Sequence, residues 1–99
     1  MKSLSKILKN SHNYLIGSKE VLKNIEKAKI VIYADTLEPK IKEKAESICK
    51  DRSIPIYNSN NTSLELGRLC NKPFRVSILA LTDIDDNDLQ MLLKEINNN

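Results

Sequence analysis

The sequence predicts an α/β fold: a single-domain, three-layer α/β/α sandwich built on a small, mostly four-stranded mixed sheet. Short apolar runs rich in β-branched residues alternate with segments whose apolar residues recur at helical spacing. This alternation places helices on both faces of a sheet. The chain has 99 residues, of which 40% are hydrophobic and 29% charged, and this suits one domain with one core over residues 1–99.

The first third of the chain is expected to form two helices and a buried strand. A short amphipathic helix is indicated by three apolar residues on one face, Leu4, Ile7 and Leu8. The apolar run Tyr14–Ile16 ends at Gly17, and Ser18 can then cap a second helix. The buried side of that helix is predicted to consist of Val21, Leu22 and Ile25. Residues 30–34 are continuously apolar, as expected of a strand covered on both faces.

The middle of the chain predicts a helix, a strand and a turn. Pro39 suits the first turn of a helix. The core stripe of this helix is predicted to be Ile41, Ala45, Ile48 and Cys49. Residues 54–57 are predicted to form a strand whose start is not fully paired, because Pro55 has no N–H to donate. Residues 58–61 are a polar turn.

The last third predicts a helix, a strand and a final helix. Thr62 and Glu65 have the spacing of a capping box, so a helix begins directly after Thr62. Residues 76–81 form the third clear strand, and Asp85 or Asp86 then caps the last helix. Its buried positions are predicted to be Leu89, Leu92, Leu93 and Ile96. The final few residues are expected to fray.

Composition and local sequence favour a cytosolic protein that does not enter a membrane. No apolar run approaches the roughly 20 residues of a membrane helix. Residues 1–6 lack the apolar stretch and cleavage site of a signal peptide. Cys49 and Cys70 have neither metal-type nor redox-type spacing, so we expect reduced thiols.

Charge is unevenly distributed along the chain. Residues 1–52 hold 12 Lys/Arg and 7 Asp/Glu, a balance of +5, whereas residues 53–99 hold 4 and 6, a balance of −2. Such a chain can present a cationic face to an anionic partner. On charge alone, however, solvated helix faces are the simpler explanation.

The sequence lacks a convergent set of catalytic groups. His12 is the only histidine, and no nucleophile or orienting carboxylate is recognisable with it. Cys49 lies on a core stripe, where cysteine behaves as a small hydrophobe, and Cys70 occupies a similar place. The acidic run 83–88 contains no glycine, so it is not a calcium-type loop, and helix capping explains it. We expect no enzyme activity, no cofactor and no metal site.

Residues 17–23 are harder to explain by structure alone. Gly17 at the start of a helix lets another backbone approach closely, and first-turn amides attract an anion. Lys19, Lys23 and Lys27 recur every four residues and form a basic row. Lys19 opposes the helix dipole, and a residue that breaks a local rule is a candidate for function. The alternative is a solvated lysine face.

Residues 72–75 are the second such segment. Phe74 is the only Phe in the chain and stands between Lys72 and Arg75 in a loop that contains Pro73. An aromatic ring with cations on a loop suits stacking on an unpaired base while phosphates are neutralised. A Phe folded back onto the core would explain the segment equally well.

Several collinear motifs resemble the archaeal and eukaryotic ribosomal protein L thirty-e family and, more widely, the kink-turn RNA-binding superfamily. The motifs cover most of the chain from Tyr14 to Asp88: residues 17–19, 28–32, Pro39, 54–57, 61–67 and 69–76. The strongest is Leu69-Cys70-Asn71-Lys72-Pro73-Phe74-Arg75-Val76. The resemblance implies the same sandwich fold that the periodicity predicts.

The resemblance also implies that three neighbouring loops grip a kinked RNA internal loop with tandem sheared G·A pairs. Gly17, Ser18 and Lys19 would contact the G·A pairs, and Thr36 stands where the family often has Asn. Phe74 would stack on an extruded base. The RNA-binding residues expected on this basis are Gly17, Ser18, Lys19, Lys23, Thr36, Lys72, Phe74, Arg75 and Val76.

The first hypothesis is therefore a structural protein of the large ribosomal subunit, located in the cytoplasm. Its partners would be ribosomal RNA and neighbouring ribosomal proteins, with no membrane contact and a monomeric free state. Lys19 favours this ribosomal branch, whereas Asn61 replaces a family Gly and Asp35 adds a negative charge beside the RNA face. The alternatives are a free-standing kink-turn binder in RNA modification or regulation, and a small α/β enzyme or ligand-binding domain.

Overall fold

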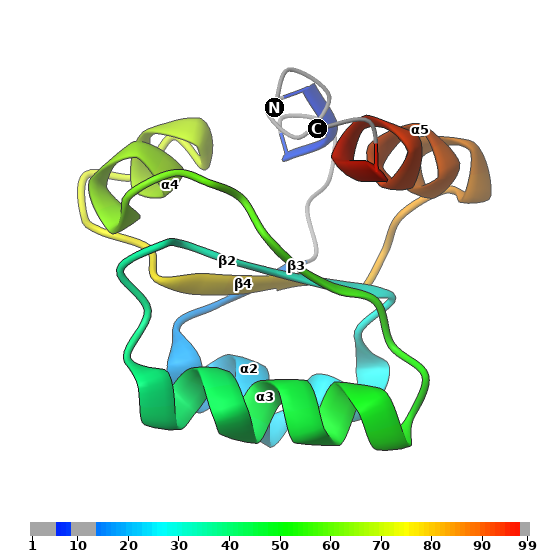
Figure 1. The fold of residues 1–99 in the computed structure, drawn as a ribbon. Coiled ribbons are helices and arrows are strands. Elements are labelled where there is room, and N and C mark those ends of the chain that lie inside the picture. Colours follow the sequence, from blue (N-terminus) through cyan, green and yellow to red (C-terminus); the bar gives the residue numbers. More distant parts are fainter. Residues whose placement is uncertain (1–5, 9–13, 98–99) are drawn as a thin grey trace.

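The computed structural model describes residues 6–8 and 14–97. Its elements are β1 (Tyr14–Ile16), α2 (Ser18–Lys23), η1 (Ile25–Lys27), β2 (Ile30–Tyr33), α3 (Pro39–Asp51), β3 (Ile56–Asn58), α4 (Ser63–Leu69), β4 (Ile78–Leu81) and α5 (Asp86–Asn97). Helices α2 and α3 cover one face of the sheet, and α4, α5 and the helical residues 6–8 cover the other (Figure 1). This arrangement confirms the predicted three-layer α/β/α sandwich.

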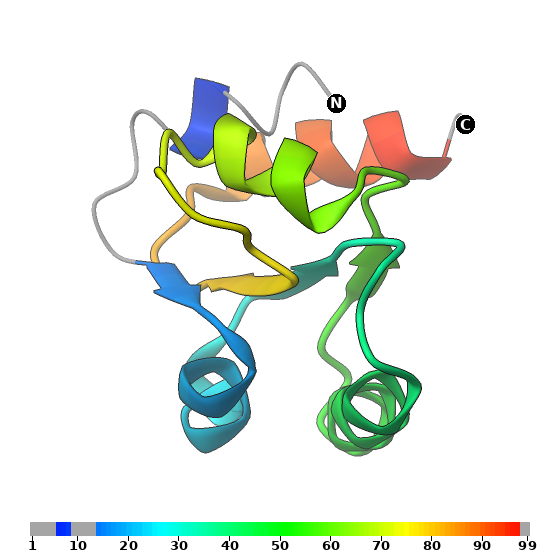
Figure 2. The same ribbon diagram turned by 90° about the vertical axis from the view of Figure 1, so that its left-hand side faces the viewer.

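The four strands form a mixed sheet in the order β1-β4-β2-β3. Strand β4 runs antiparallel to both β1 and β2, whereas β2 and β3 are parallel. In this register Tyr33, at the end of β2, pairs with Ile78 at the start of β4 and with Asn58 at the end of β3. The ends of β1, β2 and β3 and the start of β4 therefore meet at one end of the sheet, which faces the viewer in Figure 2.

Strands β2 and β4 form the centre of the core because side chains on both of their faces are buried. Successive residues alternate between the two faces, as the pleat of a strand requires. Ile30, Ile32, Leu79 and Leu81 pack in the cluster under α4 and α5. Val31, Tyr33, Ile78 and Ala80 pack in the cluster against α2 and α3. The continuous apolar runs thus mark strands covered on both faces, as predicted.

Two predicted helix starts are confirmed. Pro39 is the first residue of α3, and Ala45 and Cys49 on its core stripe are fully buried. At α4 the capping box is complete, since the Glu65 N–H donates to Thr62 Oγ1 at 3.2 Å and the Thr62 N–H donates to Glu65 Oε1 at 3.0 Å. These exchanges satisfy two N–H groups that the helix itself cannot pair.

The prediction that Ser18 caps a helix is wrong. Gly17 occupies the capping position with φ of 94°, and no side chain caps α2. Its carbonyl accepts a hydrogen bond from the Val21 N–H at 2.9 Å, and Ser18 is the first helical residue. The helix is also shorter than expected, because it ends at Lys23 and Ile25 begins the 3-10 turn η1.

Strand boundaries differ from the prediction by one or two residues. Strand β3 starts at Ile56, although the Pro55 carbonyl still accepts a hydrogen bond from the Val31 N–H at 2.9 Å. Strand β4 starts at Ile78 because Val76 and Ser77 belong to the preceding loop. The predictions for Leu4 and His12, and for fraying at residues 98–99, fall outside the described residues.

Candidate nucleic-acid interface

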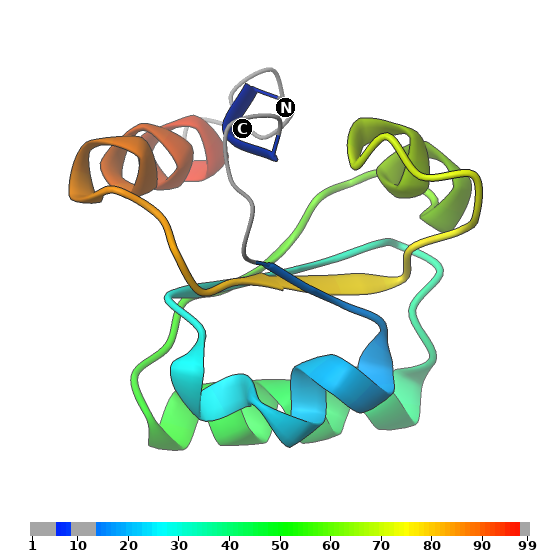
Figure 3. The ribbon, with the colours of Figure 1, turned by 180° about the vertical axis from the view of Figure 1, so that it is seen from behind.

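Three loops meet at the start of β4. The β1–α2 junction is tied there by the Gly17 N–H, which donates to the Ile78 carbonyl at 3.0 Å. The β2–α3 loop is tied by the Ala34 N–H, which donates to the Ser77 carbonyl at 2.8 Å. Ser77 ends the α4–β4 loop. The chain thus brings together the three loops to which the predicted site residues belong, as seen end-on in Figure 2 and from behind in Figure 3.

Asp35 fastens the β2–α3 loop to the neighbouring β3–α4 turn. Its carboxylate Oδ1 accepts a hydrogen bond from Asn58 Nδ2 at 2.7 Å, and its N–H donates to the Asn61 carbonyl at 2.8 Å. Both contacts join segments that are more than twenty residues apart in the sequence. The negative charge that the sequence left unexplained therefore has a structural role, which sequence reasoning missed.

Ser63 connects two of the three loops through its backbone. Its N–H donates to Thr36 Oγ1 at 3.1 Å, and its carbonyl accepts from the Val76 N–H at 3.0 Å. Thr36 thus supplies an acceptor at the start of α4, while its hydroxyl proton can still be donated to a ligand. The first turn of α4 holds the β2–α3 and α4–β4 loops in a fixed relation.

Gly67 brings the α4–β4 loop against the α4 backbone. A β-carbon at this position would overlap the carbonyl oxygen of Phe74 and stand 3.4 Å from the Cα of Arg75. Only a residue without a side chain permits so close a backbone approach. Gly67 is a second residue that sequence reasoning did not assign a role, although a glycine inside a helical pattern is a signal of close packing.

Phe74 is directed away from the core. Its side chain is 53% exposed, and the neighbouring Lys72 and Arg75 are also exposed. Lys72 Nζ lies over the ring of Tyr14, 6.0 Å from its centroid, so the loop also contacts β1. Of the two explanations for this segment, the structure favours a presented ring over a Phe folded onto the core.

Val76 differs from the other residues expected at the interface. Its side chain is only 1% exposed and packs in the cluster under α4 and α5. The RNA contact expected of Val76 stays a prediction, because its apolar side chain is buried at the start of the run into β4 and its N–H is donated to the Ser63 carbonyl.

The basic row on α2 is shorter than its spacing predicted. Lys19 and Lys23 are exposed on α2, but the helix ends at Lys23 and Lys27 belongs to η1. Among the described residues, neither Lys19 nor Lys23 forms an ion pair. Lys19 thus lies in the first turn of α2 next to Gly17, whereas Lys23 is the last residue of the helix.

The sequence of the chain matches a known family over most of its length. The model of the ribosomal protein L7Ae/L30e/S12e/Gadd45 family matches residues 1–90. The chain belongs to this family. The family resemblance found in the motifs, from Gly17 through the strong stretch 69–76, is thereby confirmed.

Curated relatives of the chain include large ribosomal subunit proteins eL30 from several organisms. That of Sulfurisphaera tokodaii is 35% identical over 92 residues, which cover 91% of this chain and 87% of the relative. That of Archaeoglobus fulgidus is 36% identical over 85 residues, covering 84% of this chain and 94% of the relative. That of Methanothermobacter thermautotrophicus is 35% identical over 79 residues, covering 78% of this chain and 81% of the relative.

A solved structure supports the fold of this family member independently. A protein of unknown function from Bacillus halodurans C aligns with a TM-score of 0.80 at 22% identity, covering 96% of this chain and 94% of that one. At this identity the likeness concerns the fold alone.

The two cysteines lie in the interior of the family fold. Burial raises the pKa of the Cys49 thiol to about 11, with a smaller contribution from the Glu46 carboxylate. Burial also raises the pKa of the Cys70 thiol to about 11, against the opposing effect of Lys72. At neutral pH both are uncharged thiols, which are poor nucleophiles.

Neither a metal cluster nor a membrane-spanning segment is found in the parts of the chain that the structure describes. Over residues 6–8 and 14–97, no three His, Cys, Asp or Glu side chains gather closely enough to hold a metal ion. Within the same ranges, no helix combines the length and apolar character needed to cross a membrane.

Proposed function

We propose that this protein is a structural constituent of the large ribosomal subunit that binds a kink-turn-like internal loop of ribosomal RNA. The observation that carries the proposal is the exposed ring of Phe74, presented by a loop that is fixed against α4 beside two other loops. A ring fixed in this way can stack on an unpaired base at small entropic cost. The relatives named large ribosomal subunit protein eL30 support the ribosomal assignment.

We take the roles of the residues from the family resemblance, and their positions at the three loops are compatible with those roles. Gly17, Ser18 and Lys19 contact the sheared G·A pairs and the adjoining backbone. The Thr36 hydroxyl donates a hydrogen bond while its oxygen accepts the Ser63 N–H. Phe74 stacks on the extruded base. Phosphates are neutralised by Lys19, Lys23, Lys72 and Arg75.

In this proposal affinity and specificity come from different parts of the interface. The lysines and Arg75 contribute sequence-independent, salt-sensitive binding. Loop shape and stacking by Phe74 select a kinked, partly unpaired RNA. The protein acts without catalysis or cofactor in the cytoplasmic ribosome, beside other ribosomal proteins, and is monomeric when free.

Sedimentation of a cell extract tests the ribosomal role. The protein is expected to travel with large subunits in gradients that contain high salt, because shape-specific contacts persist when simple charge attraction is screened. Recovery of the protein at the top of the gradient, or with small RNA–protein particles, would instead indicate a free-standing kink-turn binder.

A further inference from the structure

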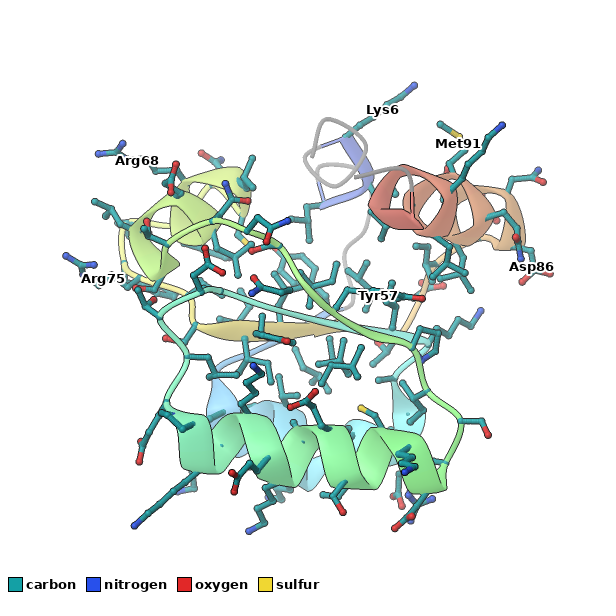
Figure 4. The ribbon with its side chains drawn as sticks, viewed as in Figure 1. Lys6, Tyr57, Arg68, Arg75, Asp86 and Met91 are labelled. Carbon is teal, nitrogen blue, oxygen red and sulfur yellow. The ribbon has the colours of Figure 1, made fainter. Side chains whose placement is uncertain are left out.

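Three of the four cations in the acidic half of the chain lie close together in the sequence. Residues 53–99 contain only four Lys/Arg, namely Arg68, Lys72, Arg75 and Lys94. The first three lie within the eight residues 68–75, which form the end of α4 and the loop after it. Figure 4 shows Arg68 and Arg75 projecting from the same edge of the molecule, away from its body, with Arg68 farther from the sheet.

Arg68 is held in place and remains available to a ligand. It follows Gly67, which is buried against the backbone of Phe74 and Arg75, so this part of α4 is fixed relative to the loop. The Arg68 side chain is exposed and forms no ion pair with any residue in the described ranges. An exposed guanidinium on a fixed helix is suited to a phosphate group.

Stability of α4 offers a competing explanation for Arg68. A cation in the last turn of a helix interacts favourably with its dipole. Arg68 also acts on Glu65, where its positive charge is the smallest of the influences that lower the pKa of that carboxyl. Both effects concern folding and would be the same whether or not RNA is present.

We propose that Arg68 extends the RNA interface beyond the three loops by binding backbone phosphate of the helical stem that flanks the internal loop. This inference rests on the proposed function, because it takes the internal loop to be seated on Phe74 and Arg75. An RNA seated there continues into a paired stem, and Arg68 lies farther along the same edge of the protein. The A-form stem presents phosphates and 2′-hydroxyls at its surface, so the contact is independent of sequence.

RNAs that differ only in stem length can show whether Arg68 contacts the stem. We would measure binding of Arg68→Gln to two RNAs with the same G·A-containing internal loop, one with stems of a full helical turn and one with stems only long enough to close. On the long-stem RNA we expect Arg68→Gln to weaken binding about two- to fivefold and to reduce the salt slope by about 1, the size of one exposed phosphate contact. On the short-stem RNA the variant should match the wild type.

Lys94→Gln is the matched control, because it removes the same charge from the exposed surface of α5. It should bind both RNAs as the wild type does. Thermal unfolding of Arg68→Gln measures any contribution to helix stability separately, and Arg68→Lys should retain most of the long-stem affinity.

The possible outcomes separate the two proposals. If Arg68→Gln binds each RNA as tightly as the wild type does, and the wild type still prefers the internal loop, the stem contact alone is overturned. Loss of affinity that is the same for both stem lengths would also overturn it. A matched duplex with the loop closed is measured beside them, and if the wild type binds this duplex as tightly as the internal-loop RNAs, the proposed function itself fails.

Discussion

The carbonyl oxygen of Phe74 occupies the space that a β-carbon on Gly67 would need. The loop that presents Phe74 therefore packs backbone to backbone on α4, and its ring is left 53% exposed at the surface. A ring held in this way needs little ordering when a base stacks on it. The packing of Gly67 on this loop thus links a glycine inside α4 to the proposed RNA contact.

Replacing Gly67 by Ala should disturb both stability and RNA binding. The new methyl group meets backbone atoms, which cannot turn aside as a flexible side chain would. We expect the free energy of unfolding to fall by about 1–2 kcal/mol, since overlap in a packed site outweighs the better helix propensity of Ala. Denaturant unfolding measures this, with Ser47→Ala on the exposed surface of α3 as control. Unchanged stability together with unchanged RNA affinity would contradict this account of the loop.

Phe74→Ala should weaken a kinked-loop RNA and spare the fold. The expected loss of binding free energy is about 1–3 kcal/mol, the usual worth of a base–aromatic stack. Because the ring is half exposed, the melting temperature should change little. Titration against loop and straight-duplex RNAs checks the selectivity of the loss. Equal losses on both RNAs would exclude a stacking role.

Lys23→Ala provides the contrasting variant at the same interface. Lys23 is exposed near the end of α2, where it can neutralise a phosphate whatever the shape of the RNA. We expect weaker binding to every RNA and a salt slope smaller by about 1. A loss confined to the kinked RNA would show instead that Lys23 contributes to specificity.

Thr36→Val should destabilise the junction between two loops. The substitution leaves the Ser63 N–H without its acceptor in a residue that is only 6% exposed. The expected cost is about 1–3 kcal/mol of unfolding free energy, the penalty for an unsatisfied buried donor. Thr36→Ser keeps the hydroxyl oxygen that accepts the Ser63 N–H, so its free energy of unfolding should fall much less. Similar stability of the two variants would show that this hydrogen bond contributes little.

The capping box at α4 should make stability fall in acid. Hydrogen bonding to the backbone N–H of Thr62, and then to its side chain, lowers the pKa of Glu65 in the folded state. A carboxyl with a lowered pKa stabilises the fold at and above the usual pKa of Glu, and this contribution is lost as pH falls through the lowered value. Unfolding measured from neutral to acid pH should therefore show a shallower decline for Glu65→Gln. Glu43→Gln, on α3, should follow the wild-type curve.

Both thiols should be unreactive until the protein unfolds. With each pKa raised to about 11 by burial, roughly one thiol in a thousand is ionised near pH 8. A colorimetric disulfide reagent should react slowly with the native protein and rapidly with both cysteines in denaturant. Rapid reaction of Cys70 in the native state would show that the end of α4 opens readily.

Local sequence signals predicted much of the fold. The Thr62–Glu65 spacing identified a capping box because both partners lie within one helical turn. Residues 30–34 identified a strand buried on both faces, because the signal is a run of neighbouring apolar residues. Ser18 misled the prediction because the positive φ of Gly17 moves the helix start back by one residue.

The contacts between loops depend on tertiary structure, so no local sequence pattern predicts them. Asp35 meets Asn58, and Gly67 meets Phe74, only after the strands have paired in their order. The motifs placed the predicted contacts on three loops, and hydrogen bonds at Ile78, Ser77 and Ser63 bring those loops together. The burial of Val76 follows from where β4 enters the core.

The most direct test of the central claim is a salt titration of binding to a short RNA with an asymmetric internal loop and tandem G·A pairs. A matched duplex with the loop closed is measured beside it. Shape-specific recognition by the three loops predicts that preference for the loop RNA persists as salt rises, because stacking and close fit are not screened. Equal affinities that decline together would contradict the account and leave only a mildly cationic surface.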